Sequence, residues 1–148
     1  MDEDLRPLFS GYGPVMTIPV HWGDMDALSH VNNVVYFRWL ESSRVTLIDS
    51  LKAVADSKMH GIGPILASAK CDYRLQTRFP DTVSVASRID HVGRTSVRLK
   101  QVVVSHEQRA IVAEGEAILV LYNYHAGKPV PIEGVLRSAL ETMLPGKD

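Results

Sequence analysis

A single change of hydrophobic period constrains the fold of this chain more than any other feature of its sequence. Across about residues 33–55, apolar side chains recur at the three- and four-residue spacing of an α-helix. They are Tyr36, Phe37, Trp39, Leu40, Leu47, Ile48 and Leu51. Because this apolar stripe is wide, it predicts one long and largely buried helix.

The rest of the chain has the composition of β-strands. Beyond a Gly- and Pro-containing connection at about residues 61–64, four segments are rich in β-branched residues, namely 65–73, 82–92, 95–105 and 110–122. An earlier segment, 15–22, predicts a first strand, and an irregular loop is expected over 23–32. A last short helix is expected at about residues 132–143, after Pro131.

Alternation of side chains is clearest in the second of the four segments. It places Val83, Val85 and Ile89 on one face of a strand and Ser84, Arg88 and Asp90 on the other. One strand, a long helix and four more strands predict an α+β fold, in which a five-stranded antiparallel sheet wraps around the helix. Periodicity alone does not select this topology from others with the same elements.

Length and composition fit one folded domain spanning residues 1–148. A chain of 148 residues buries roughly two-thirds or more of its unfolded surface on folding, which is enough for one core. No internal repeat or linker-like stretch divides it. A formal charge of −1 leaves no surplus of positive charge for a nucleic-acid backbone, so no nucleic-acid partner is expected.

The cellular compartment is predicted from cysteine content and hydropathy. Cys71 is the only cysteine, which rules out an intramolecular disulfide and fits a reducing cytoplasm. The acidic start of the chain does not resemble a secretion signal, and no apolar run is long enough for a membrane span. We therefore expect a cytoplasmic protein that is not inserted in a membrane.

The densest group of functional side chains lies just before the long helix. Asp24, Asp26, His30, Asn32 and Asn33 fall within ten positions. The carboxylates lie in the loop, close to the helix start, where free backbone N–H groups and the positive end of the helix dipole are found. An anionic base next to such donors has the parts of a hydrolytic acyl-transfer site.

Each of these residues also has a structural explanation. Asparagines at a helix start commonly cap it, Asp24 suits a hydrogen bond within the loop, and a lone histidine such as His30 is commonly a partly buried side chain. Asp24, Asp26 and His30 have the chemistry of metal ligands. The other histidines are scattered and form no metal-binding pair, so we expect no metal.

Other catalytic motifs do not occur. The sequence has no GxSxG, no Walker loop and no GxGxxG. Cys71 lies within a predicted strand without a nucleophile turn around it, and we expect it to be a small core residue. The chemistry is therefore expected at the aspartate loop.

At this loop the chain resembles the 4-hydroxybenzoyl-CoA thioesterase-like family of hotdog proteins, in particular its acyl-CoA thioesterase branch. The resemblance rests on D-x-D-x-x-x-H-V-N-N over residues 24–33 and on the following aromatic helix, which ends in L-E-x-x-R at Arg44. The segment FPDTVSVASRIDHVGRTSV, residues 79–97, supports it. The similarity extends over about residues 15–124.

The resemblance implies hydrolysis of an acyl-CoA or a closely related thioester, with coenzyme A as part of the substrate and no cofactor consumed. It implies that Asp26, the second carboxylate of the motif, is catalytic, and that the backbone N–H at about Asn33 supplies the oxyanion hole. It also implies subunits that join their sheets edge to edge with active sites at their boundary. A homodimer or homotetramer is therefore expected.

Supporting roles are expected for several further residues. His30 is expected to orient the loop or the substrate carbonyl, and Asp24 to support the fold of the loop. Arg94, Thr95 and Ser96 are candidates for binding the coenzyme's phosphates or pantetheine, because arginine and hydroxyl groups at a strand turn suit such contacts. Ordinary turn chemistry is the alternative for them.

Glu41 is a rival carboxylate, because other hotdog thioesterases use a glutamate on the central helix. It lies eight residues beyond Asn33, which is about 12 Å along a helix axis. We therefore expect it to pair with Arg38 or Arg44 instead.

Two departures from the family's pattern limit the resemblance. Ser29 stands where the family often has a glycine, so the backbone conformation of the loop at this position does not follow from the resemblance. Residues 27–29 are Ala-Leu-Ser, whereas the aryl-CoA branch has proline, alanine and glycine after D-x-D. An aromatic substrate is therefore not inferred.

Two other functions stay open. A non-catalytic acyl-CoA-binding or regulatory hotdog module would share the same fold, since a fold does not fix a function. A hydratase or dehydratase is a further alternative, but the D-x-x-x-N-x-x-H order of that chemistry is absent around Asp26. The acyl-CoA thioesterase is the leading hypothesis.

Overall fold

A computed structural model of the chain describes residues 2–51 and 61–146. Its helices are η1 (Glu3–Phe9), η2 (Trp22–Asp24), α1 (Asn33–Leu51) and α2 (Gly134–Thr142), of which η1 and η2 are 3₁₀ helices. Its strands are β1 (Val15–Pro19), β2 (Ile62–Tyr73), β3 (Thr82–Val92), β4 (Ser96–Ser105), β5 (Ala110–Asn123) and β6 (Lys128–Pro129). The predicted long helix is therefore present up to Leu51, and the rest of its predicted span, 52–55, lies outside the described residues.

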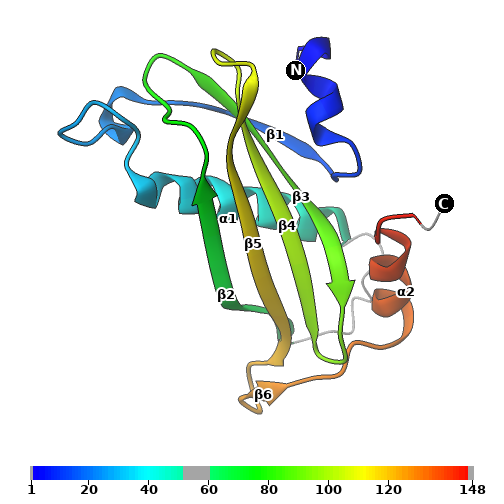
Figure 1. Cartoon of the computed structure of the whole chain (residues 1–148). Helices are drawn as coiled ribbons and strands as arrows, with labels where there is room; N and C mark the ends of the chain where they lie inside the picture. Colours follow the sequence, from blue (N-terminus) through cyan, green and yellow to red (C-terminus); the bar gives the residue numbers. More distant parts are fainter. Residues whose placement is uncertain (1, 52–60, 147–148) are drawn as a thin grey trace.

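The strands form one antiparallel sheet in the order β1-β3-β4-β5-β2, with β6 paired to β5. Figure 1 shows this sheet curling around α1, while α2 lies beside the end of β3. The arrangement confirms the predicted α+β architecture. The sheet has six strands instead of the predicted five. The additional strand is β6, whose two residues follow the turn after β5 and pair back onto β5.

Several boundaries differ from the prediction. β2 begins at Ile62 instead of residue 65, because residues 62–64 pair with 121–123 of β5 and are not a connection. β1 ends at Pro19, and Trp22 begins a short 3₁₀ helix. The helix η1 was not predicted, since seven residues that include Pro7 give too short a pattern for periodicity.

The core lies between α1 and the concave face of the sheet. One cluster surrounds the first half of α1, and a second surrounds its end and α2. Gly115 of β5 lets the helix approach closely, because a Cβ there would lie 3.0 Å from Leu40 Cδ1. Tyr36 and Trp39 pack edge to face, with ring centroids 5.0 Å apart.

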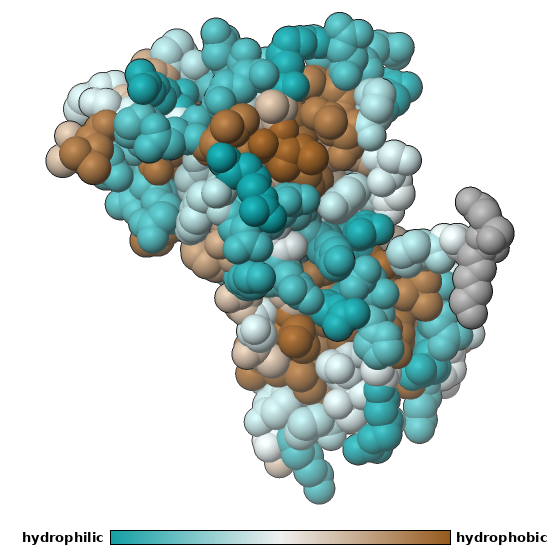
Figure 2. Space-filling view, viewed as in Figure 1, coloured by the Kyte–Doolittle hydropathy of each residue, from teal (hydrophilic) through white to brown (hydrophobic). Residues whose placement is uncertain are grey.

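The outer face of β3 is covered as well. The predicted alternation along β3 holds, but Ser84 is fully buried rather than exposed to solvent. Leu5 and Phe9 of η1 form a third apolar cluster with Ala86 and other outward residues, and Figure 2 shows apolar residues gathered beside η1. The Ser84 hydroxyl lies 2.7 Å from His106 Nε2, so the buried polar group is satisfied.

β2 forms one edge of the sheet, since among the described strands it pairs only with β5. Every residue from 64 to 70 is exposed along this edge. Ile65 and Leu66 keep 38% and 45% of their surface accessible to solvent. An exposed edge with apolar side chains is a ready site for pairing with another strand.

Candidate active site

The loop between β1 and α1 is held by its own backbone. The N–H of Asp26 donates to the carbonyl of His30 at 2.8 Å, and the N–H of Asn32 donates to the carbonyl of Asp24 at 2.9 Å. These two bonds fold the loop back on itself, so that Asp26 lies opposite His30 and Asp24 lies opposite Asn32, the residue before α1. The sequence neighbours predicted to form a site are thus brought together.

The two aspartates of the motif have different environments. Asp24 is buried, with 7% of its surface exposed. Its Oδ2 accepts from the N–H of His21 at 2.8 Å, and its Oδ1 accepts from Arg38 Nη2 at 2.9 Å. Both oxygens of Asp24 are therefore taken up by contacts that hold the loop against α1.

Asp26, in contrast, is exposed and largely uncommitted. Its Oδ1 accepts one hydrogen bond, from the N–H of Leu28 at 2.9 Å. No other donor and no cation pairs with this carboxylate among residues 2–51 and 61–146. One oxygen is oriented by the loop, and the other is free to act on a ligand.

The start of α1 presents an open backbone donor. The side-chain Oδ1 of Asn32 accepts from the N–H of Val34 at 3.1 Å, and its carbonyl accepts from the N–H of Val35 at 2.9 Å. Asn32 is thus the capping residue. In the described part of the chain the N–H of Asn33 has no acceptor, which makes it the donor available for an anion at the positive end of the helix.

His30 lies half-buried at the base of the same loop. Its Nε2 is buried and has no hydrogen-bond partner within the described ranges. A buried polar nitrogen without a partner is uncommon in a folded protein. His30 therefore has an unsatisfied ring nitrogen next to the aspartate loop.

Tyr73, at the end of β2, touches this region from the sheet. Its hydroxyl donates to the carbonyl of Asn33 at 3.1 Å and ties the helix start to the edge strand. Partial burial and the neighbouring Cys71 raise the pKa of Tyr73 to about 12. The phenol therefore stays protonated and keeps donating at any physiological pH.

Comparisons with known proteins show the family of this chain. The profile of the thioesterase-like superfamily matches residues 20–140. The chain belongs to the thioesterase-like superfamily. Membership confirms the resemblance to the thioesterase hotdog proteins, and it supports thioester hydrolase as the class of enzyme.

Individual members of the superfamily are distant in sequence but cover most of the chain. The long-chain acyl-CoA thioesterase FadM of Escherichia coli (strain K12) is 25% identical over 127 residues, which are 86% of this chain and 96% of FadM. The PA2801 protein of Pseudomonas aeruginosa is 29% identical with a TM-score of 0.76, covering 87% of this chain and 98% of that one. The DHNA-CoA thioesterase of Staphylococcus aureus is 19% identical with a TM-score of 0.74, and the match covers 88% of this chain and 87% of that one. At this low identity the match supports only the fold.

The serine that replaces the superfamily's frequent glycine keeps a glycine-like backbone. Ser29 has a φ of 61°, in the left-handed region that favours glycine. Its N–H donates to the carbonyl of Asp26 at 3.0 Å, so this conformation closes the turn after the catalytic candidate. Ser29 therefore has a backbone conformation that a glycine at this position would adopt readily.

This backbone strain leads to a prediction about stability. Ser29→Gly is expected to change the free energy of unfolding by less than about 0.5 kcal/mol, because relief of the left-handed strain is offset by the entropy of glycine in the unfolded chain. Ser29→Val is expected to destabilise by about 1–2 kcal/mol, since a β-branched residue tolerates positive φ poorly. Urea unfolding measures both. Equal effects of the two substitutions would contradict the strained turn.

The predicted partner of Glu41 is wrong. Arg38 pairs with Asp24, while Arg44 turns into the core and donates to Gln101 Oε1 at 3.3 Å. Burial lowers the pKa of the Arg44 guanidinium, and the charge of Glu41 opposes that shift. Glu41 itself is exposed and makes no ion pair with any residue of the described ranges.

The three candidates for coenzyme binding lie at the other end of the molecule from Asp26. They form the turn from β3 into β4, where the carbonyl of Arg94 accepts from the N–H of Ile132 at 2.7 Å and that of Thr95 from Leu121 at 2.8 Å. The Asp26 loop instead adjoins the opposite end of β3, where the N–H of Val20 donates to the carbonyl of Asp81 at 2.9 Å. Within one subunit the turn with Thr95 and Ser96 is not part of the Asp26 site.

Sequence reasoning missed the contribution of Tyr73 and the commitment of Arg38 to Asp24. Both contacts cross between elements, and no local spacing signals them.

Nothing in the described ranges gathers three or more His, Cys, Asp or Glu side chains into a group suited to a metal ion. The helices of the described ranges are also too short or too polar to cross a membrane.

The environment of Cys71 gives a second prediction. Cys71 lies on the inner face of β2, packed against the core, and burial raises the pKa of its thiol. At pH 7.5 we expect iodoacetamide to alkylate it at least about tenfold more slowly than free cysteine, because the thiolate is the reactive form. Mass spectrometry of the intact protein gives the rate. Fast alkylation that also abolishes activity would point to a cysteine nucleophile instead.

Proposed function

We propose that this protein is a single-domain acyl-CoA thioesterase that hydrolyses its substrate to a free acid and coenzyme A, with Asp26 as the catalytic carboxylate. The observation that carries this proposal is the difference between the two aspartates. Asp24 is buried and bonded at both carboxylate oxygens, whereas Asp26 is exposed and has one free oxygen, in the loop that leads to the open N–H of Asn33. A thioesterase needs a free base or nucleophile next to such a donor.

The reaction uses few groups because a thioester carbonyl is electrophilic and its thiolate leaves readily. Asp26 either attacks the carbonyl carbon to form a mixed anhydride, which water then cleaves, or it takes a proton from the water that attacks. In both routes the carbonyl oxygen becomes an anion, and we assign the N–H of Asn33 to bind it. No cofactor is consumed, because coenzyme A arrives as part of the substrate.

The remaining loop residues have supporting roles in this proposal. The unpartnered Nε2 of His30 is assigned to orient the substrate carbonyl or the loop. Asp24 is assigned a positioning role, since its carboxylate is taken up by Arg38 and His21. Arg94, Thr95 and Ser96 are kept as candidates for the phosphates or pantetheine of the coenzyme, contributed by a second subunit.

The working unit is proposed to be a homodimer, or a tetramer built from it, joined through the free edge of β2. Ile65 and Leu66 leave this edge apolar and exposed in a single chain, and pairing with a second copy would cover it.

The cytoplasm is proposed as the compartment, because the only cysteine is a free thiol.

A free-thiol release assay on short, medium, long and aromatic acyl-CoA thioesters tests this function. Release of coenzyme A over many turnovers from at least one thioester is the expected result. Saturable binding of acyl-CoA without release would instead favour the non-catalytic binding module. Water addition to an enoyl-CoA without loss of the thioester would favour a hydratase.

A further inference from the structure

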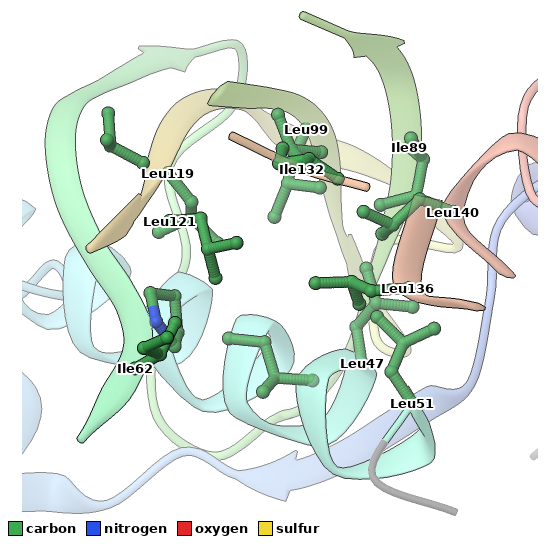
Figure 3. A pocket seen from close by; sticks show the side chains of 15 residues that line it. Leu47, Leu51, Ile62, Ile89, Leu99, Leu119, Leu121, Ile132, Leu136 and Leu140 are labelled. Carbon is green, nitrogen blue, oxygen red and sulfur yellow. The ribbon is translucent and has the colours of Figure 1, made fainter. Parts of the chain in front are cut away.

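An apolar cavity lies at the end of the molecule opposite to Asp26. It has a volume of about 300 Å³ and lies between the last turns of α1, the start of β2, the second half of β5 and α2. Figure 3 shows Leu47, Leu121, Leu136 and Leu140 among the side chains that surround the opening from several elements. Every one of the 15 lining residues that belong to the described part of the chain is aliphatic, glycine or proline.

The chemistry of this lining selects the occupant. Among the described residues no lining side chain has a hydrogen-bonding group, so a hydroxyl or carboxyl group placed against them would lose its bonds to water. A hydrocarbon chain gains about fourfold in affinity for each methylene buried. A methylene fills a volume close to that of a water molecule, about 30 Å³, so 300 Å³ accommodates roughly ten carbons.

This cavity is too far from Asp26 to serve it within one subunit. Leu47 lies 14 residues beyond Asn33 on α1, which is about 21 Å along the helix. Along β2, Pro64 lies nine residues before Tyr73, the contact of Asn33, which is about 30 Å. An extended chain of ten carbons, with bonds of about 1.5 Å, spans only about 12 Å.

A second copy of the chain removes this mismatch. Two copies of β2 that pair antiparallel across a two-fold axis are turned end for end relative to each other. The exposed stretch, residues 64–70, has Ala67 at its midpoint. With the axis at Ala67, where the pairing of β2 with β5 has an irregularity, Ile62 in the lining of one cavity would stand opposite the partner's Asp72, next to the partner's Tyr73 and the start of the partner's α1.

We infer that the apolar cavity of each subunit holds the acyl chain of the substrate whose thioester is cleaved at the partner's Asp26, and that this chain is unsubstituted and about ten carbons long. The inference rests on the proposed thioesterase function and adds the substrate class and the origin of the acyl pocket. The same pairing brings the turn at Arg94 to the partner's site, because that turn lies at the cavity end of the sheet.

Filling the cavity tests the substrate class. In Leu121→Phe the ratio of kcat/KM for decanoyl-CoA to that for butanoyl-CoA is expected to fall about tenfold to a hundredfold, since two or three methylenes lose their place. Leu136→Phe, on α2, is a second variant in case the first does not fold. Leu8→Phe, on η1 at the outer face, is the matched control. An unchanged ratio in both folded cavity variants would overturn the inference, whereas inactivity of the wild type on every acyl-CoA would refute the proposed function itself.

Mixed dimers test the origin of the pocket. Asp26→Asn and Leu121→Phe chains, carrying different tags, are co-expressed, and decanoyl-CoA hydrolysis is compared with that of each parent alone. If the cavity serves the partner, the mixed dimer joins an intact Asp26 to an intact cavity, and random pairing restores about a quarter of the wild-type sites. If the cavity serves its own subunit, the intact Asp26 lies on the chain with the filled cavity. Activity no higher than the sum of the parents, with mixed dimers verified by the tags, would overturn the inference.

Discussion

Replacing Asp26 with asparagine should lower kcat by about a hundredfold to ten-thousandfold, the range typical of a positioned acid or base. The amide keeps the size of the side chain and the Oδ1 acceptor for the N–H of Leu28. It removes the negative charge on which both proposed routes depend. Thermal melting should therefore show a folded protein of nearly unchanged stability, while thiol release on the best acyl-CoA is almost lost.

Two matched carboxylate substitutions serve as controls. Asp24→Asn breaks the pair with Arg38, and since Arg38 is 63% exposed we expect a loss of stability of only about 1–2 kcal/mol and a smaller loss of kcat. Glu41→Gln should be milder still, because Glu41 is exposed and unpaired among the described residues. Near-normal kcat in Asp26→Asn combined with loss in Glu41→Gln would move the catalytic carboxylate to α1.

Introducing a carboxylate at the centre of the β2 edge should separate the subunits and inactivate the enzyme. Ala67 is exposed at the midpoint of the free stretch, so Ala67→Glu sets two like charges against each other at the two-fold axis. At micromolar concentration we expect sedimentation to show monomers and kcat/KM on decanoyl-CoA to fall below about one tenth of the wild-type value, since each site needs both chains. The change lies on the surface, so folding of the single chain should be retained.

Charge reversal and a distant substitution control this experiment. Mixing Ala67→Glu with Ala67→Lys chains places opposite charges at the axis and should restore both dimers and activity. Ala126→Glu, in the exposed turn after β5, should alter neither. A fully active Ala67→Glu monomer would show that one chain contains the whole site.

The parts of the fold that follow from local pattern were predictable from the sequence. Helical spacing predicted α1, and β-branched segments predicted β1 to β5. Burial of one face of an element imposes a hydrophobic period on its sequence, and this period can be seen without knowing which other elements pack against that face. The cover of η1 over Ser84 was not predictable in this way, since it depends on which segment packs on the outer face. β6 is too short to have a period.

The candidate site was likewise predictable only where its residues are close together in the chain. The loop motif placed Asp24, Asp26 and His30 together, because they are close in the chain as well as in space. The pairing of Arg38 with Asp24 and the contact of Tyr73 with Asn33 depend on tertiary packing. The apolar cavity draws on residues from Leu47 to Leu140, and no segment of the sequence shows it.

The most direct test of hydrolysis follows the oxygen atom of water. Purified wild-type protein is incubated with excess decanoyl-CoA in ¹⁸O-labelled water, and the products are analysed by mass spectrometry. The account predicts equal amounts of free coenzyme A and singly labelled decanoate, formed in large excess over the protein. Intact decanoyl-CoA recovered in a fixed ratio to the protein, with no labelled acid from it or from any other acyl-CoA, would contradict a thioesterase centred on Asp26.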